Sequence, residues 1–156
     1  MPFVDVGGAR LEVERIDVGR ASGAPIVMLH EGLGSVSMWK DFPRRVAHGA
    51  TRNVLVSSRA GYGRSSPAKR PYGVRYMHDE ALVVLPRLLV ACAIERPILL
   101  GHSDGGSIAV IHAAAAGRPV AGLVLMAPHV VVEDVSIASI AAAKVAWRTT
   151  DLRARL

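Results

Sequence analysis

One five-residue segment, Gly101-His102-Ser103-Asp104-Gly105, constrains the fold of this chain more than any other part of its sequence. A short apolar run, residues 97–100, precedes the segment, and an alanine-rich run with helical spacing, residues 106–116, follows it. A strand that turns this sharply into a helix needs small residues around the serine, whose hydroxyl then projects from the tip of the turn. The segment therefore predicts a buried strand, a tight turn that exposes Ser103, and a helix.

The rest of the chain alternates between short apolar runs and helical patterns. Continuous apolar strands that alternate with helices predict an α/β fold, in which helices cover both faces of a mostly parallel, doubly wound sheet. We expect strands at residues 4–6 and 11–16, which form a hairpin around Gly7-Gly8, and at residues 26–29, 53–56, 97–100 and 120–126. Further helices are expected at residues 38–47, interrupted early by Pro43, and at residues 77–94, with a kink or restart at Pro86.

The last segment of the chain, residues 135–156, is expected to be a separate helical unit. Apolar side chains recur there with helical spacing, at Ile137, Ile140, Ala141 and Val145. Asp134 or Ser136 is placed to cap such a helix. Because the chain ends within this pattern, we interpret residues 1–134 as the N-terminal part of a core and residues 135–156 as the start of a helical lid. The chain is then truncated before the last strands of the fold.

Composition and charge exclude several classes of function. Hydrophobic residues make up 51% of the chain, which is enough for a core, and the single cysteine, Cys92, is expected to be a buried apolar residue. The net charge of +6 comes mostly from arginines that are scattered singly, so we expect no nucleic-acid partner. No signal peptide and no membrane-spanning run is evident, which favours a cytoplasmic protein without a membrane partner.

Two glycine pairs, Gly32-Leu33-Gly34 and Gly61-Tyr62-Gly63, suggest a dinucleotide-binding fold, but neither carries the third glycine of that motif. Position 37, where the first would need it, is Ser37, and the second fails in the same way at Ser66. The sequence has no phosphate-binding Walker motif and no His/Cys cluster with metal-ligand spacing. We therefore predict no cofactor and no metal.

Three motifs, each after a predicted strand, resemble those of the α/β-hydrolase fold over residues 4–134. The first is the segment around Ser103. The second, His30-Glu31-Gly32-Leu33-Gly34, resembles the oxyanion loop, with Glu31 in place of the usual first glycine. The third, residues 58–65, resembles the Asp-Arg-x-Gly-x-Gly-x-Ser loop, with Ser58 in place of the aspartate.

The resemblance implies a serine hydrolase that acts on a carboxylic ester or a related small acyl compound. Ser103 would attack the carbonyl carbon, and the backbone N–H of Asp104 would stabilise the negative charge that develops on the oxygen. The second N–H donor is expected from Gly32, with Leu33 as the alternative. A serine at this position argues against the dehalogenases and epoxide hydrolases that resemble this family, because those use an aspartate.

The base that activates Ser103 is harder to assign, because in this fold the acid and the histidine follow the serine along the chain. His112 is nine residues further along the same helix, about 13 Å away. His129 follows the next strand and is interpreted mainly as a pocket residue, with the role of base as the weaker alternative. His30 is expected to order the oxyanion loop. The triad acid and histidine are therefore expected to be missing from this chain.

Two classes of function stay open. The chain is either part of a serine hydrolase or a noncatalytic fragment or binding module that retains the turn around Ser103. A perhydrolase or a carbon–carbon bond hydrolase would carry the same motifs. We expect these 156 residues alone to hydrolyse activated esters only weakly, and to associate through an exposed sheet edge or the terminal helix, including as a homo-oligomer.

Overall fold

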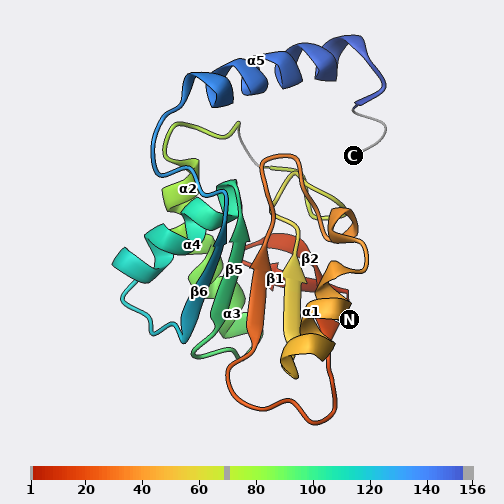
Figure 1. Cartoon of the computed structure of the whole chain (residues 1–156), viewed down its shortest axis with the longest axis vertical. Helices are drawn as coiled ribbons and strands as arrows, with labels where there is room; N and C mark the ends of the chain where they lie inside the picture. Colours follow the sequence, from red (N-terminus) through yellow and green to blue (C-terminus); the bar gives the residue numbers. More distant parts are fainter. Residues whose placement is uncertain (1, 69–70, 153–156) are drawn as a thin grey trace.

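A twisted six-stranded sheet forms the centre of the molecule in the computed structural model, which describes residues 2–68 and 71–152. The strands are β1 (Phe3–Val6), β2 (Ala9–Ile16), β3 (Ile26–Leu29), β4 (Val54–Ser57), β5 (Ile98–His102) and β6 (Gly122–Met126). Their order is β1-β2-β4-β3-β5-β6, with β1 and β2 antiparallel to their neighbours and the other pairs parallel (Figure 1). The predicted hairpin and mostly parallel sheet are confirmed.

The central strands are apolar throughout because helices cover both faces of the sheet. In β3, Val27 and Leu29 face one core cluster, whereas Ile26 and Met28 face the other. All four residues of β3 and all four of β4 are buried. This burial explains why the sequence shows continuous apolar runs rather than an alternating pattern.

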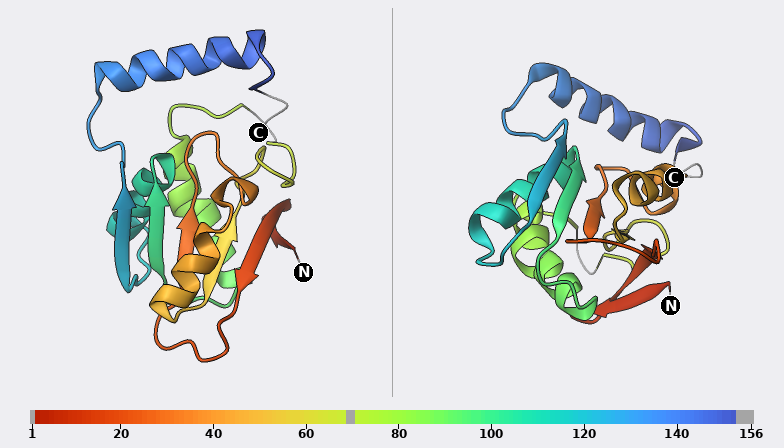
Figure 2. Two further views of the ribbon diagram at one scale, coloured as in Figure 1. Left: turned by 45° about the vertical axis from the view of Figure 1, so that its right-hand side comes forward. Right: turned by 60° about the horizontal axis from the view of Figure 1, so that its bottom comes forward.

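One face of the sheet packs against α4 (Asp104–Ala115) and a long irregular helix (Figures 1 and 2). That helix consists of α2 (Tyr76–Asp79), a π-helical segment η2 (Glu80–Val84) and α3 (Leu85–Ala91). Pro86 lies in the first turn of α3. Because proline lacks an N–H and its ring crowds the preceding turn, the regular α-helical pattern gives way before it. The predicted irregularity at Pro86 is confirmed.

The other face is covered by α1 (Phe42–Ala50), which follows a single 3₁₀ turn, η1 (Ser37–Trp39). The expectation that Pro43 interrupts this helix is wrong. Pro43 lies in the first turn of α1, where its missing N–H has no intrahelical partner to lose. The break falls instead at Lys40, whose φ of 53° separates η1 from α1.

The terminal helix α5 (Asp134–Thr149) lies across the carboxyl ends of the parallel strands, as Figure 1 shows. Its N-cap is Glu133, so the expectation that Asp134 or Ser136 caps this helix is wrong. Ile137, Ile140 and Val145 are exposed on it. The edge strand β6 is also half exposed at Leu123, Val124 and Leu125. No helix among the described residues is long and apolar enough to cross a membrane.

Candidate active site

Ser103 lies at the turn between β5 and α4 and adopts a backbone conformation with φ of 51° and ψ of −116°. This region is costly for a residue other than glycine, so the surrounding structure must hold the turn in place. The Ser103 N–H donates to the carbonyl of Met126 at 2.8 Å, and Gly105 packs directly against the Leu29 carbonyl. The predicted strand, tight turn and helix are all present.

His129, the weaker alternative for the base, lies beside Ser103. The Ser103 Oγ is 2.8 Å from the His129 Nε2, within hydrogen-bond distance. The expectation that no histidine of this chain reaches Ser103 is therefore wrong. β5 and β6 are parallel neighbours, with His102 opposite Met126, so the residues that follow the two strands meet at the same edge of the sheet.

The main chain of His129 is held by the side chain of Ser107, one turn into α4. The His129 N–H donates to the Ser107 Oγ at 2.9 Å, and the Ser107 hydroxyl lies 3.3 Å from the His129 carbonyl oxygen. Ala127 has a positive φ of 45°, which redirects the chain after β6 toward α4. These contacts position the imidazole through its own backbone.

The Asp104 carboxylate contacts three side chains near Ser103. Its Oδ2 accepts a 2.5 Å hydrogen bond from the Tyr76 hydroxyl and lies 3.7 Å from the Arg59 guanidinium. Its Oδ1 is 3.6 Å from the His129 Nε2. Burial and the hydrogen bond to this carboxylate raise the pKa of Tyr76, so its hydroxyl is a permanent donor at neutral pH.

The loop after β3 is ordered by two buried side chains. The His30 Nδ1 lies 2.7 Å from the Glu31 carbonyl oxygen, and its Nε2 accepts a hydrogen bond from the Arg59 N–H at 3.0 Å. The Arg59 guanidinium donates to the carbonyls of His30 and Glu31 at 2.7 and 2.9 Å. Burial and the charge of Arg59 lower the pKa of His30 to about 3, so it stays neutral and orders the loop as expected.

The other histidines and the cysteine make their contacts with groups other than the Ser103 hydroxyl. His112 is buried, and its Nδ1 lies 2.8 Å from the Ala81 carbonyl, whereas His48 and His78 are exposed. The His102 Nδ1 is 3.6 Å from the Glu31 carboxylate. Cys92 is buried as predicted, and burial raises the pKa of its thiol.

A carboxylate from β2 occupies the place next to Ser58, where the family motif has an aspartate. The Ser58 hydroxyl donates to the buried Glu12 carboxylate at 2.9 Å, and Arg64 donates to it through both its backbone N–H and its Nε, at 3.0 and 2.6 Å. Burial raises the pKa of Glu12, but these hydrogen bonds outweigh it and hold the pKa below its usual value. The negative charge missing at position 58 is thus supplied by Glu12.

A groove of about 800 Å³ separates α5 from the carboxyl end of the sheet and contains the predicted site residues. It is lined on the core side by Gly32, Leu33, Tyr62, Tyr72, Tyr76, Ser103, Asp104 and His129. This volume is typical of sites for small organic ligands. Tyr76, Arg59 and Ser107 were missed as site residues, because each acts through a contact with a residue distant in the sequence.

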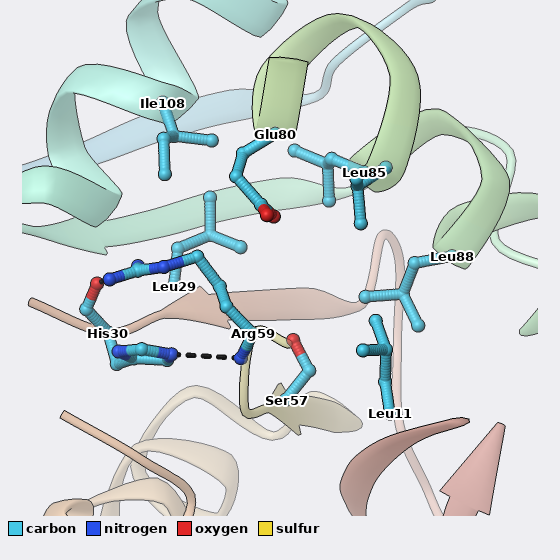
Figure 3. A pocket seen from close by; sticks show the side chains of 10 residues that line it. Leu11, Leu29, His30, Ser57, Arg59, Glu80, Leu85, Leu88 and Ile108 are labelled. Atoms are coloured by element: carbon cyan, nitrogen blue, oxygen red, sulfur yellow. Dashed lines mark hydrogen bonds between the residues drawn. The ribbon is translucent and has the colours of Figure 1, made fainter. Parts of the chain in front are cut away.

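A second cavity of about 20 Å³, large enough for a water molecule, lies beneath the loop after β3. Figure 3 shows the Glu80 side chain pointing into it among Leu29, Leu85 and Ile108, with Arg59 and His30 on the opposite wall. The Nε of the Arg59 side chain is buried and forms no hydrogen bond among the described residues. Burial and the negative charge of Asp79 raise the pKa of Glu80 to about 7, although the positive charge of Arg59 opposes this shift.

The raised pKa of Glu80 predicts a specific pH dependence of stability. The folded protein keeps the Glu80 proton up to about pH 7, whereas the unfolded chain releases it near the ordinary value of 4.5. Between these values the wild type therefore loses stability as pH rises, by roughly 3 kcal/mol in full. We expect Glu80→Gln, which stays neutral, to gain stability relative to wild type from pH 5 to pH 8 in urea unfolding.

The readout is the difference in free energy of unfolding between variant and wild type, because other groups also titrate. The lowered pKa values of His30 and His112 make the wild type more stable as pH rises toward 6.5, which opposes the Glu80 contribution. Glu95→Gln removes one exposed carboxylate and serves as the matched control. For each variant, the quantity to compare is its free energy of unfolding minus that of the wild type. If this difference varies as little with pH for Glu80→Gln as for Glu95→Gln, Glu80 is ionised in the folded protein.

Comparison with known proteins agrees with this fold. A family model described as alpha/beta hydrolase fold matches residues 24–155. The chain belongs to the alpha/beta hydrolase fold family.

Similar proteins include both curated sequences and solved structures. The chain is 29% identical over 120 residues to a 2-hydroxy-6-oxo-2,4-heptadienoate hydrolase of Pseudomonas putida, covering 74% of this chain and 41% of that protein. It is 30% identical to a dihydrolipoyllysine-residue acetyltransferase component of an acetoin cleaving system of Pseudomonas putida, covering 79% of this chain and 31% of that protein. A carboxylesterase structure from Nitrososphaera gargenis superposes with a TM-score of 0.80 at 21% identity, covering 98% of this chain and 55% of that one.

The chain therefore spans less than half the length of these curated relatives. The part of the chain that the family model matches, residues 24–155, includes Gly32, Ser103 and Asp104. One of these curated relatives is a hydrolase, and the solved structures that share the fold include esterases.

Proposed function

We propose that this chain carries the nucleophile of a serine hydrolase that acts on a carboxylic ester or a related acyl compound. The observation that carries the proposal is the 2.8 Å contact between the Ser103 Oγ and the His129 Nε2, at a strained turn that opens into the groove. A serine hydroxyl is a weak nucleophile unless a base takes its proton, and His129 is in reach of that proton.

In the proposed reaction the Ser103 oxygen bonds to the carbonyl carbon while its proton passes to the His129 Nε2. The carbonyl π-bond becomes a negatively charged oxygen in the tetrahedral intermediate. When that oxygen re-forms its double bond, the bond to the leaving group breaks, and His129 returns the proton to the leaving oxygen. Water then attacks the acyl-serine by the same steps in reverse, with His129 again as base, and releases the acid and free Ser103.

Two backbone N–H groups are proposed to stabilise the oxyanion. Asp104 begins α4, and N–H groups in the first turn of a helix have no intrahelical acceptor. Gly32 lies across from it, in the loop held by His30 and Arg59, with Leu33 as the alternative donor. Losing one such donor typically removes roughly 2.7–4 kcal/mol of transition-state stabilisation.

The charge distribution around His129 supports only part of a triad. The Asp104 Oδ1, 3.6 Å from the Nε2, favours the protonated imidazole that forms during the reaction. Within residues 2–68 and 71–152, no acceptor binds the His129 Nδ1, where a triad acid would lie. We therefore propose a Ser103–His129 dyad in this chain, with α5 as the start of a lid over it.

Labelling with a fluorophosphonate probe tests the assignment of the nucleophile. We expect the probe to attach to Ser103, as located by mass spectrometry of the digested protein. Ser103→Ala should abolish labelling, because among the described residues no other serine that lines the groove is hydrogen-bonded to a histidine. Ser139→Ala, on the α5 wall of the same groove, is the matched control and should label like the wild type. A folded protein without any Ser103 adduct would favour the noncatalytic binding module instead.

A further inference from the structure

The aromatic side chains of this chain are concentrated in one place. Aromatic residues make up only 4% of the sequence, yet all three tyrosines and one of the two tryptophans line the groove beside Ser103. They come from three separate segments: Tyr62 from the loop after β4, Tyr72 and Tyr76 from the approach to and start of α2, and Trp147 from α5. Packing of the hydrophobic core does not explain why the aromatic side chains cluster here, because the core is built from aliphatic residues.

The three tyrosines form a continuous row. The ring centroids of Tyr62 and Tyr72 are 6.1 Å apart, and those of Tyr72 and Tyr76 are 5.3 Å apart, both pairs tilted. These separations lie in the range in which aromatic rings attract one another. A further ring in the groove can therefore extend the row with the same geometry.

The polar ends of two of these rings are already occupied by the protein. The Tyr72 hydroxyl donates to the Ala60 carbonyl and the Tyr76 hydroxyl to the Asp104 carboxylate, each at 2.5 Å. The Arg59 guanidinium lies 4.9 Å from the Tyr62 ring centroid. Tyr72 is 40% exposed although its hydroxyl is bonded, so what it presents to the groove is ring surface.

The opposite wall, formed by α5, is suited to the same kind of ligand. Ile140 and Trp147 line it, and both are more than 40% exposed. A flat ring between this wall and the tyrosine row would bury apolar surface on both sides, which favours binding. The groove volume of about 800 Å³ admits a ring together with an ester group at Ser103.

We propose that the groove binds substrates whose acyl part carries an aromatic ring, held against the row Tyr62–Tyr72–Tyr76. The proposal rests on the proposed function for the position of the ester group at Ser103. It adds the substrate class: esters of arylalkanoic acids are preferred over esters of saturated acids of the same size. The preference arises from ring–ring contact, because a saturated ring buries at least as much apolar surface.

Binding of two neutral amides that resemble the substrate tests this without any turnover. Phenylacetamide and cyclohexylacetamide share the carbonyl group and differ only in the aromaticity of the ring. In NMR chemical-shift titrations of the whole chain, we expect phenylacetamide to bind about three- to tenfold more tightly. Tyr72→Leu, which keeps apolar bulk, should reduce this ratio to below about twofold, whereas Tyr72→Phe should keep it.

Equal or tighter binding of cyclohexylacetamide to the wild type would overturn the proposal, as would no saturable binding of either amide. An unchanged ratio in a folded Tyr72→Leu protein would also overturn it. Because the readout is binding, it is independent of fluorophosphonate labelling. Ring preference without labelling would contradict the nucleophile alone, and labelling without ring preference would contradict the substrate class alone.

Discussion

Replacing His129 by alanine is expected to slow the reaction of Ser103 with an activated ester or a fluorophosphonate by roughly 10²–10⁴-fold, the usual contribution of a general base. The Ser103 proton has its acceptor at 2.8 Å in the wild type, and alanine removes that acceptor. The measurement is the rate constant of labelling or of nitrophenyl acetate hydrolysis at pH 8.

His102→Ala is the matched control, because His102 is adjacent to Ser103 in the sequence but makes its contact with Glu31. That variant should react within about threefold of wild type, since it leaves the acceptor at Ser103 in place. If His129→Ala kept the wild-type rate, the Ser103 proton would pass to another group. The proposed dyad would then be excluded, although Ser103 could remain the nucleophile.

The rate of the wild-type reaction depends on what binds the His129 Nδ1, the ring nitrogen that does not contact Ser103. Weak esterase activity was expected on the ground that no histidine reaches Ser103, and that ground no longer holds. A different reason remains: within the described residues, no carboxylate is bonded to the Nδ1. In triads, that carboxylate fixes the imidazole tautomer and stabilises its charge. A dyad held only through Ser107 and the nearby Asp104 should therefore be slower than a complete triad.

The sheet and the turn at Ser103 could be predicted because their signals are local. β3, β4 and β5 contain continuous apolar runs, and the glycines that the tight turn requires lie within the five-residue segment around Ser103. Pro86 was correctly interpreted as an irregularity in its helix. Pro43 was not, because a proline disrupts a helix interior but suits a first turn, and the pattern alone did not fix where α1 begins.

The contacts of His129 could not be predicted from local pattern, because they join residues 22 and 26 positions apart. A signal was nevertheless available. Once the strands that end at His102 and Met126 are taken as parallel neighbours, the residues after them must meet at one edge. The same applies to Tyr76 and Asp104, whose hydrogen bond depends on how α2 packs on α4.

Ser58 shows a related limit. Its substitution for the aspartate of the family motif suggested a missing charge, but Glu12 from β2 supplies a carboxylate at the same place. Residue 12 is 46 positions away in the sequence, and β2 pairs with β4 in antiparallel register, so only the sheet brings them together. A motif position can therefore be compensated by a residue that no motif includes.

Gly105→Ala is expected to lower the free energy of unfolding by about 3 kcal/mol or more. A methyl group there would overlap the Leu29 carbonyl and lie 2.8 Å from the His30 carbonyl oxygen, both of them backbone atoms that cannot rotate away. Relief requires α4 to move away from β3, which would also displace Ser103 and His129. Urea unfolding measures the loss of stability, and labelling of any folded fraction should be slower than in wild type.

Gly49→Ala is the matched control, because it makes the same chemical change in a helix whose glycine has no heavy atom within 4 Å of the new methyl group. It should raise stability by about 0.5–1 kcal/mol, since alanine loses less backbone entropy than glycine on helix formation. Opposite signs for the two variants would tie the effect at Gly105 to its contact with β3. If Gly105→Ala were as stable as wild type, α4 would not lie this close to Leu29, and the geometry that places Ser103 beside His129 would have to be abandoned with it.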